Sequence, residues 1–109
     1  MSEIEKLMQN AGVEKDWKPL PYGDIEEYYP EFTAEKQLEL IKWLTKRKDF
    51  ALDYYPSCNI WVAKTDFQWN CYEETYEHKE TKQALAGLIN KLWKDLTESE
   101  KAKIKRILK

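Results

Sequence analysis

Apolar residues recur at helical intervals in several parts of the chain. Ser2 and Glu5 have the spacing of a capping box, and the apolar positions after them predict a short helix that stops at Gly12. Thr33 can cap a second helix, which is expected to end near residue 48. The longest helical stripe predicts a third helix with one apolar face, formed by Leu85, Leu88, Ile89, Leu92 and Leu96.

The C-terminal pattern predicts a fourth helix. Thr97 and Glu100 form a second capping box, and the apolar side of the helix follows at Ala102, Ile104, Ile107 and Leu108. Gly87 lies inside the third predicted helix, where glycine costs about 1 kcal/mol relative to alanine. Its presence indicates a place where that helix closely approaches a neighbour.

The region from residue 50 to residue 77 has the composition of strands. The stretches FALDYY, IWVAK and FQWNCYEETYE are separated by PSCN and TD, which predicts three antiparallel strands. A two-residue turn at Thr65 and Asp66 would pair Val62 with Trp69. The side chains on that side of the hairpin would form the core against the third helix, and they are Ile60, Val62, Phe67, Trp69 and Cys71.

Trp61 and Tyr72 then lie on the opposite side of the predicted hairpin. A second layer of the fold can cover them, for example the first helix or the aromatic segment 17–32. Alternatively, they form an exposed platform that stacks bases or holds a protein partner. We prefer the covered arrangement, because exposed aromatic patches are uncommon on monomers.

The segment between the first two helices is predicted to be irregular. It carries three prolines and a glycine, and its YGDIEEYYPEF stretch alternates acidic and aromatic residues. Tyr28 and Tyr29 make it a candidate arm for docking on a basic partner, although its tyrosines can equally pack on the domain. We therefore expect one domain over residues 1–109. Residues 1–32 form a helix and an acidic aromatic arm, and residues 33–109 contain a helix, the sheet and two helices.

The pattern resembles a family of small proteins from phages and prophages of Gram-positive bacteria, the phage ABA sandwich domain. The resemblance covers roughly residues 33–109 and rests on FTAEKQLELIKWL, the Trp61 strand and the T-x-x-ALA-x-L-I stretch from Thr81 to Ile89. It implies an α+β fold arranged as a small three-layer α/β/α sandwich, with a three-stranded antiparallel sheet and C-terminal helices. It also implies an accessory protein of a mobile element, and it transfers no catalytic or binding residues.

Composition limits the partners and the cellular location that we expect for the protein. The 18 basic and 20 acidic residues leave a net charge of only -2. This balance indicates neither the positive surface that binds nucleic acid nor the strongly negative surface of an acidic mimic. The sequence holds no apolar run of membrane-spanning length and no signal-like start, so we expect a cytoplasmic protein without membrane contact. Two cysteines, Cys58 and Cys71, are expected to be reduced.

The sequence gives no pattern typical of an enzyme. His78 is the only histidine and has no cysteine near it in sequence, which argues against a metal site and favours an exposed residue ahead of the third helix. The spacing supports no pairing of Cys58 or Cys71 with it as nucleophile and base. Glycines at 12, 23 and 87 cannot build a phosphate loop. We expect no catalytic residues, metal or cofactor.

Two functions remain open at this stage. The first is a phage or prophage accessory protein that binds an unknown host or phage protein through Trp61 and Tyr72, or through the arm with Tyr28 and Tyr29; a homodimer is also possible. The second is weak nucleic-acid binding, with Trp61 and Tyr72 stacking bases and Lys103, Lys105 and Arg106 on phosphates. We rank nucleic acid lower, because the domain as a whole is not basic.

Overall fold

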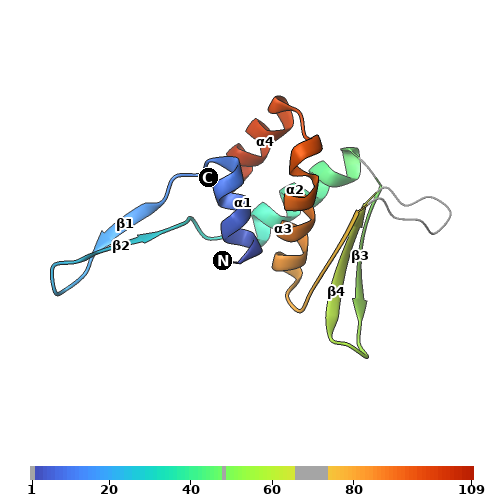
Figure 1. The fold of residues 1–109 in the computed structure, drawn as a ribbon, viewed down its shortest axis with the longest axis horizontal. Coiled ribbons are helices and arrows are strands. Elements are labelled where there is room, and N and C mark those ends of the chain that lie inside the picture. Colours follow the sequence, from blue (N-terminus) through green and yellow to red (C-terminus); the bar gives the residue numbers. More distant parts are fainter. Residues whose placement is uncertain (1, 48, 66–73) are drawn as a thin grey trace.

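The computed structural model describes residues 2–47, 49–65 and 74–109 (Figure 1). Its helices are α1 (Glu3–Ala11), α2 (Ala34–Arg47), α3 (Thr81–Leu92) and α4 (Glu98–Leu108), and the short 3-10 helix η1 (Trp93–Asp95) follows α3. Its strands are β1 (Asp16–Pro19), β2 (Ile25–Tyr28), β3 (Phe50–Tyr55), β4 (Ile60–Thr65) and β5 (Glu74–His78). Strands β1 and β2 form a separate hairpin, and the other three form an antiparallel sheet in the order β3-β4-β5.

The helix ends follow the predicted capping signals. Ser2 Oγ accepts a hydrogen bond from the Glu5 backbone N–H at 3.1 Å, and Gly12 ends α1 in the left-handed conformation with a φ of 73°. Thr33 Oγ1 accepts from the first turn of α2, and Thr97 forms the predicted capping box at the start of α4. These caps satisfy backbone N–H groups that would otherwise lack partners, so they set the helix starts locally.

Helix α3 ends earlier than its apolar stripe predicts. The α-helical part stops at Leu92, and the 3-10 turn η1 carries the chain to Leu96, which is still buried. The predicted close approach at Gly87 is confirmed. A β-carbon at this glycine would lie 2.3 Å from ring atoms of Tyr76 on β5, so only glycine allows α3 to lie this close to the sheet.

The pairing of β4 corrects the predicted hairpin. Thr65 pairs with Glu74 and Val62 pairs with Glu77, so the two-residue turn at Thr65 and Asp66 and the pairing of Val62 with Trp69 are wrong. Thr-Asp lacks the strong turn preference of Asn-Gly, so no local signal held the two strands in that register. The expected partner residues Phe67, Trp69, Cys71 and Tyr72 lie outside the described residues.

The faces of β4 are also exchanged relative to the prediction. Trp61 and Ala63 face the core together with Tyr76 of β5, whereas Val62, although buried, does not belong to the core cluster. Lys64 lies on the same side as Val62, and its Nζ donates to Asp53 at 2.8 Å. The prediction placed Val62 in the core because it paired β4 with Phe67, Trp69 and Cys71. In the structure β4 pairs with β3 and β5 instead, and this pairing places the apolar neighbours on the Trp61 side.

One core cluster joins the helices to this inner face of the sheet. It takes side chains from residues 1–32 as well as from residues 33–109. Helix α3 packs on β4 and β5, α1 packs on α3, and α4 contacts both α1 and α2. Three successive layers can thus be followed outward from the sheet: the sheet, α3 and α1 (Figure 1). The α+β class, the three-stranded antiparallel sheet and the C-terminal helices are confirmed.

Candidate functional site

The β1–β2 hairpin, residues 16–28, projects from the helices as an arm. Figure 1 shows it at the end of the molecule opposite the three-stranded sheet. The radius of gyration is 15.4 Å, above the value of about 13 Å expected for a compact chain of this length. All eight strand residues of the arm are exposed. The prediction of an irregular segment is therefore corrected, because this part of it forms an ordered hairpin outside the core.

Local chemistry explains why this segment forms a hairpin. Gly23 has a φ of 90°, which glycine adopts without strain, and its N–H donates to the Leu20 carbonyl to close the turn. Pro19 has no N–H to give, and it stands at the end of β1, where the hydrogen bond from Leu20 N–H to the Asp24 carbonyl continues the pairing. The alternation of the strands then decides which side chains share a face.

The two faces of the arm differ in polarity. Trp17 pairs with Glu27 and Pro19 pairs with Ile25, so one face presents two apolar side chains and a proline; we call it the apolar face. The opposite face carries two cross-strand pairs, Asp16 with Tyr28 and Lys18 with Glu26, and the second is an exposed ion pair of 3.3 Å. We call this side the polar face.

The apolar face and the tip of the arm are open to solvent. Trp17 and Ile25 are each 64% exposed, and Tyr22 in the turn is 74% exposed. Tyr28 is 44% exposed, and it lies on the polar face. A two-stranded hairpin has no second layer that could cover these side chains. The arm is therefore an apolar surface displayed away from the core.

The acidic excess of the arm is larger than that of the whole chain. Between residues 16 and 28 it holds Asp16, Asp24, Glu26 and Glu27 against one lysine, Lys18. The chain as a whole has a net charge of -2 and the arm one of -3, so the remainder is slightly basic, with a net charge of +1. A partner with positive charge near an apolar patch is thereby favoured over a phosphate backbone.

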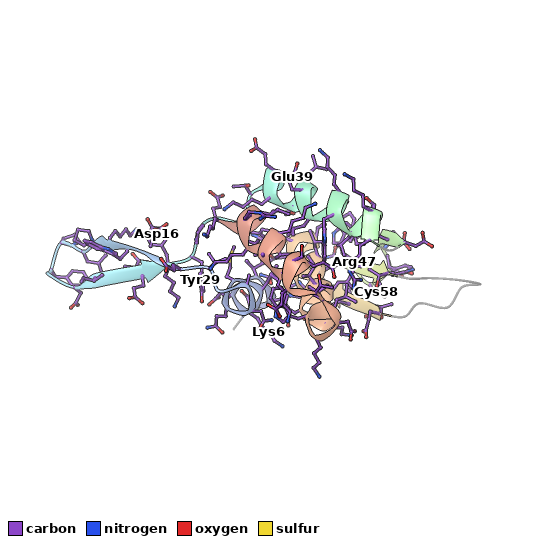
Figure 2. The ribbon with its side chains drawn as sticks, turned by 90° about the horizontal axis from the view of Figure 1, so that it is seen from above. Lys6, Asp16, Tyr29, Glu39, Arg47 and Cys58 are labelled. Atoms are coloured by element: carbon purple, nitrogen blue, oxygen red, sulfur yellow. The ribbon has the colours of Figure 1, made fainter. Side chains whose placement is uncertain are left out.

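The base of the arm meets α4 at a cavity of about 310 Å³. Its lining combines two apolar residues with two acids and two lysines, namely Val13, Pro30, Glu14, Asp16, Lys105 and Lys109. Figure 2 labels Asp16 and Tyr29 where the arm joins the body. Tyr29 is partly buried against the core, and Lys15 Nζ lies 5.0 Å from its ring centre. Of the two tyrosines predicted as a site, only Tyr28 belongs to the exposed arm.

Helix α4 carries all three residues predicted to contact nucleic acid, and they differ in exposure. Lys103 and Arg106 are exposed on α4, three residues apart, whereas Lys105 is partly buried and lines the cavity. Lys105 Nζ would lie 3.9 Å from a β-carbon at Gly12, next to the C-terminal end of α1. No basic residue lies in the last turn of α1, so this ammonium supplies the positive charge that a helix C-terminus favours.

Of the two residues of the predicted aromatic platform, Trp61 lies within the described part of the chain. Trp61 is partly buried on the inner face of the sheet, and its ring centre is 4.9 Å from that of Tyr54. Tyr72 lies outside the described residues. The arm presents the more exposed aromatic side chains, although the sequence predicts this segment to be irregular. The sequence signal for the hairpin was a period of two on each side of the turn. Trp17 and Pro19 share a face before the turn, and Ile25 and Glu27 share the same face after it.

The rest of the described chain offers little reactive chemistry. Within residues 2–47, 49–65 and 74–109, no group of three or more histidine, cysteine or acidic residues is placed to hold a metal. His78 Nδ1 accepts a hydrogen bond of 3.0 Å from the Glu80 backbone N–H, just before α3 begins. Among the same residues, no helix has the length and apolar character needed to cross a membrane.

Comparison with known proteins leaves the arm as the main guide to function. No family model, curated protein or solved structure matches the chain. The resemblance to the phage ABA sandwich domain therefore stays a prediction.

Proposed function

We propose that the protein is a non-enzymatic interaction module that binds another polypeptide chain through the apolar face of its arm. The observation that carries this proposal is the exposure of Trp17 and Ile25 on one face of a hairpin that lies outside the core. We also propose that it is an accessory protein of a phage or prophage, as its resemblance to the phage ABA sandwich domain implies.

Physical chemistry supports a bound state for this arm. An isolated two-stranded hairpin is marginally stable in water, and a third strand or a packed layer on its apolar face stabilises it. Tryptophan and tyrosine are enriched at the energetically dominant positions of protein interfaces. Covering the apolar face would remove Trp17 and Ile25 from water, a favourable change of roughly 25 cal/mol for each Å² of apolar surface.

The charge around the apolar face also favours a polypeptide over nucleic acid. The arm carries four acidic residues, which would repel phosphates, and Lys105 is partly buried beside the C-terminal end of α1. In a protein interface the same acids would lie at the rim and set orientation and association rate.

The proposal is tested with a matched pair of double variants. Trp17→Ala with Ile25→Ala removes the apolar face, whereas Lys18→Ala with Glu26→Ala alters the opposite face of the same two strands. Each tagged chain is used to capture polypeptides from a bacterial lysate supplemented with the untagged chain. We expect the wild type and the polar-face variant to retain a polypeptide that the apolar-face variant loses. Equal retention by all three chains would overturn the proposal.

A further inference from the structure

We propose that the polypeptide bound by the arm is an extended segment with alternating basic and apolar residues, which adds to the open edge of β2 as a third, antiparallel strand. This inference rests on the proposed function and specifies the chemistry and the conformation of the partner. It is supported by the direction of the backbone groups of β2, by the position of Pro19 on β1 and by the charge of the arm.

The first observation is the hydrogen-bond pattern of the arm. Leu20 and Asp24 form a hydrogen-bonded pair, because the Leu20 N–H donates to the Asp24 carbonyl at 2.8 Å. In an antiparallel hairpin, such pairs alternate with pairs that exchange no hydrogen bond. Ile25 and Glu27 lie one and three residues beyond Asp24, so both belong to pairs of the second kind. Their N–H and C=O groups therefore point away from β1, at the open edge of a sheet that has only two strands in the described part of the chain.

The two open edges of the arm differ because of Pro19. On β1 the outward backbone groups belong to Trp17 and Pro19, which pair with the outward residues of β2. Proline has no N–H, so the edge of β1 offers one donor where the edge of β2 offers two. A proline on an edge strand hinders the addition of another strand. An incoming strand is therefore directed to β2.

The side chains of β2 specify the sequence of an incoming strand. Alternate residues of that strand would lie beside Ile25 on the apolar face, and the residues between them would lie beside Glu26 on the polar face. Apolar residues fit the first set, because they continue the apolar face and cover part of the exposed Ile25 side chain. Basic residues fit the second set, because the arm has a net charge of -3. The antiparallel direction is favoured because it is slightly more stable per residue.

The charge of β2 also argues against a second copy of this chain as the partner. An antiparallel pair of two β2 edges would join Ile25 of one copy to Glu27 of the other. The two copies of Glu26 would then stand directly opposite each other, and like charges in that position destabilise a sheet. A basic strand has no such conflict.

The first test measures the binding of synthetic peptides to the isotope-labelled wild type by NMR titration. The probe is acetyl-KVKVKVK-amide, here called the lysine peptide, and acetyl-EVEVEVE-amide is the charge-reversed control. We expect the lysine peptide to bind about tenfold or more tightly than the control. The amide protons of Ile25 and Glu27 should become protected from exchange, whereas that of Glu26, which points toward β1, should change little. Equal affinities, or no binding of the lysine peptide up to its solubility limit, would overturn the inference.

The second test separates strand addition from packing on a face. In the antiparallel register, the valines beside Ile25 and Glu27 direct their N–H groups at β2, and the lysines direct theirs away from it. Methylating the valine nitrogens should therefore weaken binding about tenfold or more, whereas methylating the backbone nitrogens of the lysines should leave the affinity within a factor of about three. Equal losses, or the reverse order, would rule out the antiparallel strand.

The third test removes one donor from the arm itself. Glu27→Pro deletes an outward N–H of β2, as Pro19 does on β1, and Glu27→Gln is the control that removes only the charge. This N–H points away from β1, so the hairpin should persist, which the amide signals of Lys18 and Glu26 report. We expect Glu27→Pro to bind the lysine peptide about tenfold or more weakly than Glu27→Gln does. Equal binding by the two folded variants would contradict addition at this edge.

The two proposals fail in distinguishable ways. A chain that captures a polypeptide through Trp17 and Ile25, but binds the lysine peptide no better than the control, would overturn the strand inference and leave the proposed function standing. Capture that is unaffected by the loss of Trp17 and Ile25, together with no binding of the lysine peptide, would overturn both.

Discussion

The ring of Tyr76 on β5 occupies the space in which a β-carbon of Gly87 on α3 would stand, with a separation of only 2.3 Å. This contact sets how closely α3 lies on the inner face of the sheet. Burial, together with the nearby carboxylate of Glu3, raises the pKa of the Tyr76 hydroxyl above its usual value. The ring is thus held between the sheet and the helices.

Gly87→Ala should therefore destabilise the fold, although alanine is the better helix former by about 1 kcal/mol. Displacing the aromatic ring in a packed core costs about 1–3 kcal/mol, so we expect a net loss in the free energy of unfolding, measured by urea denaturation. In a Tyr76→Ala background the same substitution should be neutral or stabilising. A destabilisation of equal size in both backgrounds would show that the ring is not the cause.

Glu100 links the start of α4 to the end of α2. Burial alone would raise the pKa of this carboxyl, but hydrogen bonds from the Thr97 backbone and from Arg47 outweigh burial and lower it. A lowered pKa stabilises the fold above the unfolded value of about 4.5, and this contribution is lost as the pH falls through the folded pKa.

Glu100→Gln should consequently cost about 1–2 kcal/mol at pH 7, since it leaves the partly buried Arg47 without its carboxylate. The difference from the wild type in urea melts should shrink below pH 4.5 and vanish in stronger acid. Glu98→Gln is the matched control in the same helical turn. Glu98 itself is 94% exposed in its ion pair with Lys101, and we expect a change of less than about 0.5 kcal/mol. A pH-independent loss at Glu100 would contradict the ion-pair explanation.

The faces of β4 can be tested with two adjacent residues. Trp61 packs on the core and on Tyr54, so Trp61→Ala should cost about 2–3 kcal/mol, somewhat less than a fully buried tryptophan. Ile60 is partly buried on the opposite face, and Ile60→Ala should cost about 1 kcal/mol. Chemical denaturation of both variants gives the comparison. A larger loss at Ile60 would mean that the faces are the reverse of those described.

The arm should contribute little to the stability of the monomer. Trp17 and Ile25 are mostly exposed, so replacing both by alanine should change the free energy of unfolding by less than about 0.5 kcal/mol in dilute solution. At concentrations where a partner is bound, the wild type should become more stable than the variant, because binding stabilises the folded state. Thermal melts over a concentration series measure both effects. A large loss in dilute solution would instead assign the arm a role in folding.

The sequence alone determined the features that depend on neighbouring residues. Ser2, Gly12 and Thr97 marked helix ends because caps act through hydrogen bonds and backbone conformations within one turn. The apolar stripes predicted the helices because the spacing of one helix face is also set by residues in neighbouring turns. Gly87 predicted a close approach, although the sequence could not name Tyr76 as the neighbour.

Tertiary structure decided which faces are buried and which segment is exposed. In a strand, successive side chains point to opposite sides, so the core face of Trp61 depends on which distant residues pair with β4, and the Thr65–Glu74 pairing is not encoded by a strong local turn. The alternation of Trp17 and Ile25 was present in the sequence, but a half-apolar hairpin can lie on the core or project from it. Only the packing of α1, α3 and α4 around the rest of the core leaves this arm, and hence the candidate site, in solvent.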